Sequence, residues 1–294
     1  MAQTHHEIAY RVALSAAQRT EFAERGLLRL AGLIPTEPID RAREVVLARL
    51  SQRGLWQDGA WRLDALPRPQ YPATGLKTGR AIGHGHPELA ALTRAPDLLA
   101  MVDQLLDGHP FDRRFWYSHP QVLFTLPNAD VWRLPRGWHT DGICMASNAI
   151  PGVQMFGFLD PVGPGGGGTL VVAGSHRLVN EGRPMRIREI TRRLKREPFF
   201  RELMAGRCSA DGAFPKARVG EVLVEVLELT GEPGDVWLTD MRLLHSGAPN
   251  AADRPRMMLT CRFVRVDALR EIAKAYGKPW LAEDSDAGAA QAEP

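Results

Sequence analysis

The stretch Gly137-Trp138-His139-Thr140-Asp141-Gly142 contains two potential metal ligands two positions apart, and His245 follows much later in the chain. Because alternate residues of a β-strand point to the same side, this spacing predicts that His139 and Asp141 can bind one ion from a single strand. His245 must then come from a second strand. Two imidazoles and one carboxylate are the ligand set of a mononuclear non-haem iron site, in which three protein ligands leave other positions open.

The surroundings of these residues favour a metal site over the alternative, in which the histidines are hydrogen-bonded structural residues. Gly137 and Gly142 flank the first pair, and glycine permits a close approach of the backbone to a metal. Downstream, Glu232-Pro-Gly-Asp-Val-Trp-Leu-Thr-Asp240 enters a predicted strand through a Pro-Gly turn. It leads to Leu244-His245-Ser246-Gly247-Ala248-Pro249-Asn250, which contains the third potential ligand.

The composition is that of a globular protein. The 294 residues are 44% hydrophobic and 24% charged, which is ordinary, and they suffice for one large core with a helical annex. No apolar run reaches membrane-spanning length, and the first residues lack a signal pattern. An odd number of cysteines, three, favours a reduced compartment, so we expect a cytoplasmic protein without a membrane partner. The net charge of +3 does not suggest a nucleic-acid partner.

The first third of the chain is predicted to be helical and the rest mainly β. Ser15-Ala-Ala-Gln18 is a capping-box pattern for a helix that Gly26 ends, a second helix begins near Thr36, and a third is predicted over 96–108. Residues 56–85 are rich in Gly, Pro and aromatics and are expected to form an ordered loop. Strands are predicted at 122–125, 153–159, 170–172, 221–229, 235–238 and 257–264. Many short strands with Gly and Pro between them predict a sandwich or barrel.

Four stretches of the chain, taken together, match the motifs of one known family. They are Phe22-Ala-Glu-Arg-Gly-Leu-Leu28, Trp138-His-Thr-Asp141, Gly167-Gly-Thr-Leu-Val-Val-Ala-Gly-Ser-His176 and the block 245–256. The chain thereby resembles the phytanoyl-CoA dioxygenase family of iron(II)/2-oxoglutarate oxygenases, which includes the ectoine hydroxylases. The resemblance implies a mainly β fold with a helical N-terminal part, a cupin-like double-stranded β-helix or jelly roll. We expect one oxygenase domain over 1–294, with helices in 1–110, the core in 112–267, an insertion at 177–220 as a possible lid, and a frayed tail at 281–294.

The resemblance also implies a chemistry. Fe(2+) would be bound by His139, Asp141 and His245, with 2-oxoglutarate and O2 as cosubstrates and succinate and CO2 as coproducts. The substrate would be a small molecule of secondary metabolism that is hydroxylated, desaturated or cyclised. A halogenase would need a small residue in place of Asp141. A nucleic-acid dealkylase would show a different arginine spacing, whereas a non-redox cupin-type metal isomerase or ligand-binding protein is the alternative that stays open.

Arg256, eleven residues after His245, takes the family position that binds the far carboxylate of 2-oxoglutarate, for which the planar guanidinium is a bidentate partner. Arg254 has the same strand parity and is its main competitor, and a surface arginine is the other alternative. The family often has a serine two residues after the last ligand, where this chain has Gly247. Further candidates for the cosubstrate pocket, each of which could be ordinary core, are Thr169, Phe156 and Gln121.

Two other histidines and a run of glycines are interpreted as follows. His176 follows a glycine and a serine at a family landmark and is taken as structural, while His119 could face the pocket. The run Gly165-Gly-Gly-Gly168 is predicted to be a turn, since a phosphate-binding loop would end in Gly-Lys-Ser/Thr.

The stretch 177–207 is strongly basic, with nine Arg and one Lys against four Glu. In the family, an insertion at this place lies over the mouth of the active site, so a basic lid would attract an anionic or carrier-linked substrate. The alternative is a solvated helical face. Candidate substrate-binding residues are Arg192, Arg193 and, in the loop 56–85, Lys77.

Overall fold

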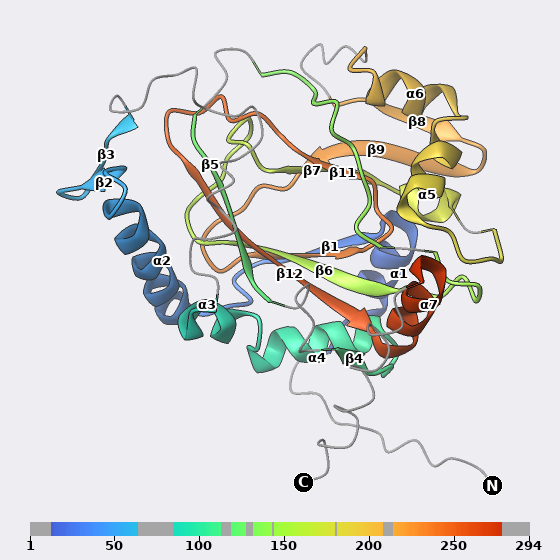
Figure 1. The fold of residues 1–294 in the computed structure, drawn as a ribbon, viewed down its shortest axis with the longest axis horizontal. Helices are drawn as coiled ribbons and strands as arrows, with labels where there is room; N and C mark the ends of the chain where they lie inside the picture. The colour runs from blue at the N-terminus through green and yellow to red at the C-terminus, as the bar shows by residue number, and fades with distance from the viewer. Residues whose placement is uncertain are drawn as a thin grey trace, which may run out of the picture.

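The computed structural model describes residues 13–63, 85–112, 119–127, 132–142, 144–179, 181–207 and 214–277. Two antiparallel β-sheets face each other, and helices cover the outer side of each sheet (Figure 1). The predicted mainly β jelly roll with a helical N-terminal part is confirmed. None of the helices in the described part of the chain is long and apolar enough to cross a membrane.

The larger sheet has the strand order β1-β10-β6-β12-β4, and β5 also pairs with β12. Its strands are β1 (Leu27–Leu30), β4 (Phe111–Asp112), β5 (Gln121–Thr125), β6 (Gly152–Phe158), β10 (Val236–Asp240) and β12 (Arg256–Arg265). Along β12, odd-numbered residues such as Leu259 pack toward the helices, whereas Met258 packs toward the second sheet. Even-numbered residues of β12 therefore face the interior between the sheets.

The smaller sheet has the order β11-β7-β9-β8. Its strands are β7 (Thr169–Ala173), β8 (Lys216–Val219), β9 (Val222–Glu228) and β11 (His245–Gly247), and a separate hairpin joins β2 (Trp56–Gln57) to β3 (Ala60–Trp61). Phe156 and Met258 of the larger sheet and Val171 of the smaller sheet belong to one buried cluster. The two sheets therefore pack against each other through this cluster.

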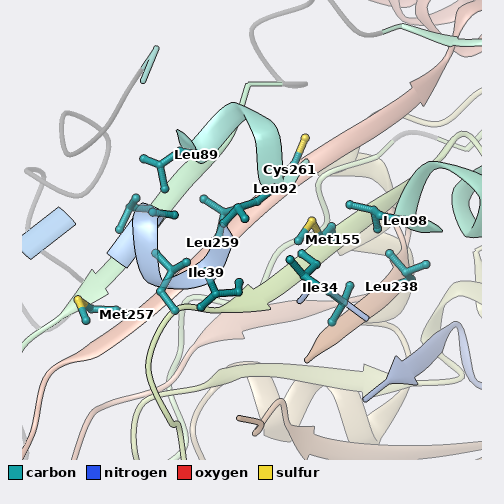
Figure 2. Packing of buried hydrophobic residues seen from close by; sticks show 14 of the residues in the cluster. Ile34, Ile39, Leu89, Leu92, Leu98, Met155, Leu238, Met257, Leu259 and Cys261 are labelled. Carbon is teal, nitrogen blue, oxygen red and sulfur yellow. The ribbon is translucent and has the colours of Figure 1, made fainter. Parts of the chain in front are cut away.

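The N-terminal helices cover the outer face of the larger sheet. They are α1 (Ala16–Arg25), α2 (Thr36–Ser51), α3 (Pro87–Leu92) and α4 (Pro96–Leu105). The predicted capping box of α1 is confirmed: Ser15 Oγ accepts from Gln18 N at 3.2 Å, and Gly26 ends the helix in the left-handed region. Figure 2 shows Ile39, Leu89 and Leu98 from the helices packing among Met155, Leu238 and Leu259 of the sheet. Each such side chain, fully buried, contributes about 1.5–3 kcal/mol.

The chain between β7 and β8 forms a short 3-10 helix, η5 (Ser175–Leu178), and the helices α5 (Ile187–Leu194) and α6 (Pro198–Met204). Ile190 and Phe200 pack against the outer face of the smaller sheet with Val224 and Val226. Strand β8 follows, inside the range expected to be an insertion, and pairs with β9.

Two helices of the described chain were not predicted from the sequence. Helix α3 is too short for a clear periodic pattern, and helix α7 (Val266–Tyr276) begins directly where β12 ends. Its Leu269 and Ala273 are buried together with Val264 of β12. Of the loop 56–85, only its beginning, the hairpin β2–β3, and Gly85 are described, so Lys77 lies outside the described residues, as does the tail 281–294.

Candidate metal centre

His139, Asp141 and His245 come together between the two sheets. One ligand atom of each residue lies within 4.8 Å of the others. The two histidines form a mutual backbone pair, in which His139 N donates to His245 O at 2.9 Å and His245 N donates to His139 O at 2.8 Å. Their ring centroids lie 4.3 Å apart, and the two ring planes are inclined at 52°. The backbone alone therefore brings the first and last ligands together.

The position of Asp141 corrects the prediction of a shared strand. His139 makes only an isolated bridge, and Asp141 lies in a bend that follows it. The N–H groups of Asp141 and Gly142 both donate to Met241 O, at 3.2 and 2.8 Å. A Cβ on Gly142 would lie 2.8 Å from Met241 Cβ, so glycine allows this contact. The bend, and not strand alternation, directs the carboxylate toward the imidazoles.

Both imidazoles have the same orientation relative to their backbones. His139 Nδ1 lies 3.0 Å from Gly137 O, and His245 Nδ1 lies 3.0 Å from Leu243 O. A carbonyl oxygen only accepts, so Nδ1 carries the proton in each neutral ring and Nε2 presents its lone pair. Burial, then the charge of His245, lowers the pKa of His139, which favours its neutral, metal-binding form.

The carboxylate of Asp141 is held through one oxygen. Gln154 Nε2 donates to Oδ2 at 3.0 Å, Arg262 Nε donates to it at 2.9 Å, and Arg262 Nη2 also contacts it. Burial would raise the pKa of Asp141, but His245, Arg262 and His139 hold it well below its usual value. No hydrogen bond among the described residues uses Oδ1, which lies 3.8 Å from His139 Nε2. Oδ1 is thus the oxygen that remains for a metal.

One side of the cluster is open. The side chain of His139 is 50% exposed, whereas those of Asp141 and His245 are 17% and 8% exposed. Two imidazoles that direct Nε2 toward a carboxylate oxygen on one side, with solvent access on the other, fit iron(II) with positions left for further ligands.

Arg256 is buried at the start of β12 and faces the same interior. Its Nη1 donates to Gly167 O and its Nη2 donates to Thr125 Oγ1, both at 2.6 Å, while its buried Nε has no hydrogen-bond partner among the described residues. Burial lowers the pKa of Arg256 to about 10, so the side chain stays charged at neutral pH. Arg254 instead forms a half-exposed ion pair with Asp160 at 2.7 Å. Among these two arginines, only Arg256 is placed to bind an anion inside the sandwich.

The other predicted pocket residues also lie on interior faces. The ring of Phe156 lies 6.2 Å from that of His245. Thr169 is buried opposite Gly247, and Gln121 pairs with Thr260 of β12. These placements are compatible with a cosubstrate wall.

The two other histidines considered as candidates, His176 and His119, have their contacts elsewhere. His176 Nε2 contacts Ala23 O at 3.1 Å beneath α1. His119 lines a hollow with Thr93, Arg94 and Phe263 on the helix side of the larger sheet, and not in the interior.

Within the described residues, three of the nine arginines of the basic stretch, Arg183, Arg193 and Arg207, form ion pairs with glutamates. Arg193 contacts Glu181 at 3.1 Å and Glu197 at 3.5 Å, and Arg207 contacts Glu202. Arg192 is exposed, and no ion pair within the described residues includes it. The two arginines predicted together are therefore placed differently.

Sequence reasoning missed Gln154 and Arg262, which donate to Asp141, and also Glu228, whose carboxylate accepts from Gly165 N and Gly168 N. The parity of β12 could have identified Arg262, since it has the same parity as Arg256. Glu228 carries no such signal, because its partners are backbone groups of the four-glycine run.

The model of the phytanoyl-CoA dioxygenase (PhyH) family matches residues 22–258 of the chain. Among solved structures, the non-haem α-ketoglutarate-dependent carbocyclase SnoK from nogalamycin biosynthesis superposes with a TM-score of 0.54 at 16% identity, over 86% of this chain and 85% of that chain. HygX from Streptomyces hygroscopicus, solved with nickel and 2-oxoglutarate, gives 0.51 at 18% identity, over 86% and 88%. These likenesses show a common fold. No curated protein matches the chain in sequence.

Proposed function

Because the chain belongs to the phytanoyl-CoA dioxygenase family and is thus a 2-oxoglutarate-dependent non-haem iron enzyme, we propose that it hydroxylates, desaturates or cyclises a small molecule. Succinate and carbon dioxide would be the coproducts. The observation that supports this most is the convergence of His139, Asp141 and His245 within 4.8 Å beside an open side.

In this proposal, residues at one end of the interior bind the metal and Arg256 at the other end binds the cosubstrate. His139 and His245 would bind iron(II) through Nε2, and Asp141 through Oδ1. When bound, the metal supplies open positions for 2-oxoglutarate and dioxygen and the oxidising power for removing a substrate hydrogen. Arg256 would bind the far carboxylate of 2-oxoglutarate through charge-assisted hydrogen bonds, and its Nε is a donor that no described residue uses. Phe156 and Met258 provide apolar side chains in the interior between the metal ligands and Arg256.

The test is succinate release by the iron(II)-loaded protein with 2-oxoglutarate across a panel of small metabolites. We expect slow succinate release without substrate and faster release with the true one. A protein that binds iron(II) but never consumes 2-oxoglutarate would instead be a non-redox metal isomerase or a ligand-binding protein.

The substrate is proposed to be anionic or carrier-linked, and the enzyme to be cytoplasmic. Support comes from α5, which exposes Arg188 and Arg192 four residues apart, while its other face is anchored by Ile190 and Leu194. The insertion is joined to the metal centre through Cys144, whose backbone forms a two-way bridge with Met185. An exposed positive charge at this place would attract a negatively charged molecule.

A further inference from the structure

The four-glycine run 165–168 encloses a carboxylate of the chain itself. Gly165 N donates to Glu228 Oε2 at 2.7 Å, and Gly168 N donates to Glu228 Oε1 at 2.9 Å. Successive backbone N–H groups that converge in this way form an anion-binding concavity. Here the anion is supplied by strand β9, so the run is a turn whose shape is fixed by Glu228.

One peptide group of this turn connects Glu228 to Arg256. The carbonyl of Gly167 accepts from Arg256 Nη1 at 2.6 Å, and the N–H of the same peptide group, on Gly168, donates to Glu228. A positive and a negative side chain thus bind opposite ends of a single amide dipole. Hydrogen bonds in such a chain polarise and strengthen one another.

The turn requires glycine where the two side chains meet it. A Cβ on Gly168 would lie 2.3 Å from Leu229 O, and Gly167 has a φ of +81°, with a Cβ that would lie 2.9 Å from Asn250 Cβ. The backbone of the turn can therefore lie this close to Leu229 and Asn250 only because both positions are glycine.

Glu228 is not itself a pocket residue. It follows Val224 and Val226 on the face of β9 that packs toward α5 and α6, whereas Arg256 faces the interior. Any effect of Glu228 on a ligand in the interior must pass through the peptide group. It also supplies the negative charge that partly offsets the burial of Arg256.

We propose that Glu228 is a positioning residue for cosubstrate binding, which acts through the Gly167–Gly168 peptide group to hold Arg256 in place and to balance its charge. This inference rests on the proposed function, in which Arg256 binds the far carboxylate of 2-oxoglutarate. In this proposal the four-glycine run presents the carbonyl of Gly167 to Arg256, while Glu228 accepts hydrogen bonds from the N–H groups of the run.

The experiment compares Glu228→Gln with two references, Arg256→Ala and Glu225→Gln. Glu225 lies on the same strand but pairs with Arg25 at the surface. The dissociation constants of iron(II), of 2-oxoglutarate and of 2-oxopentanoate are measured by calorimetry without oxygen. The last compound has the same 2-oxo acid end but a methyl group in place of the far carboxylate.

Glu228→Gln should weaken 2-oxoglutarate binding about tenfold and leave the binding of iron(II) and 2-oxopentanoate unchanged. Glu225→Gln should change none of the three. Equal losses for the two acids would mean a general structural role and would overturn the inference, as would unchanged 2-oxoglutarate binding. If Arg256→Ala also left 2-oxoglutarate binding intact, the proposed anchor itself would be wrong. Should Glu228→Gln not fold, Glu228→Asp keeps the charge but cannot reach both N–H groups, and a selective loss for 2-oxoglutarate is again expected.

Discussion

Arg256 and Arg262 lie six residues apart on the same face of strand β12, one at each end of the interior. Arg262 donates to the carboxylate of Asp141, and Arg256 donates to Thr125 and Gly167. One strand thus supports the metal ligand and carries the expected cosubstrate anchor. A shift of β12 by one residue would move both arginines to the helix side together.

Replacing either histidine of the cluster should remove iron(II) binding, but the two variants should differ in stability. His245→Ala should destabilise the metal-free protein by about 1–3 kcal/mol, because the side chain is buried and loses its bond to Leu243 O. His139→Ala should stay within about 0.5 kcal/mol, because half of its side chain is exposed. Metal analysis and urea unfolding measure the two effects. Full iron occupancy in both variants would rule out this ligand set.

Asp141→Gly should abolish turnover, because it removes the only carboxylate of the cluster. Asp240 is the matched control, since it is buried and acidic but pairs with Arg242 at 2.6 Å. Asp240→Asn should cost about 3–5 kcal/mol of stability while iron(II) still binds. Succinate release and thermal unfolding distinguish the two. Normal turnover in Asp141→Gly would point to another ligand.

Arg256→Ala should raise the dissociation constant of 2-oxoglutarate tenfold or more, since a desolvated charge-assisted pair contributes about 2–5 kcal/mol. Iron(II) binding should survive. Arg254→Ala removes a half-exposed guanidinium from the buried Asp160, which Arg43 still contacts at 3.5 Å, and should cost about 1 kcal/mol of stability or less. Titration with 2-oxoglutarate checks both, and the reverse order of effects would show that the wrong arginine is assigned.

Arg192→Ala should weaken binding of an anionic substrate at low salt, and the loss should shrink as salt screens the attraction. Arg193→Ala should have a smaller effect, because Glu181 and Glu197 already balance its charge. The comparison needs the substrate found by succinate release, and the KM at two ionic strengths is the measurement. An unchanged KM at low salt in Arg192→Ala would leave α5 as an ordinary solvated helix.

The thiols of Cys144 and Cys261 should resist alkylation in the native protein. Burial raises the pKa of each to about 12, so at pH 8 only about one molecule in ten thousand carries the reactive thiolate. Iodoacetamide treatment followed by peptide mass spectrometry should show both peptides unmodified until the chain is unfolded. Rapid modification of the folded protein would show that these sites open to solvent.

The parts of the structure that depend on local sequence were predictable. The capping residues Ser15 and Gln18 act within one turn, and the six predicted strands were marked by apolar runs between turn residues. The strand β11, by contrast, is only three residues long and exists because His245 pairs with β7. No periodic pattern can mark a strand that short.

The candidate site divides in the same way. Residue types and their order predicted the His139, Asp141 and His245 cluster, but the bend at Asp141 is set by the carbonyl of Met241, a contact across the fold. Glu228 could not be found from its surroundings in the sequence, since its partners are N–H groups that every residue type except proline offers.

The mutual backbone hydrogen bonds of His139 and His245 mean that the metal does not have to assemble its own site. In small zinc domains the ion joins distant ligands and its binding energy becomes folding energy, so removing it unfolds the chain. Here the packing of the two sheets already offsets the entropy cost of bringing His139 and His245 together. The metal-free protein should therefore keep its fold. Iron(II) should then raise the free energy of unfolding only by mass action, in proportion to the logarithm of its concentration. Iron(II) binding should return fully when the metal is added back after chelation.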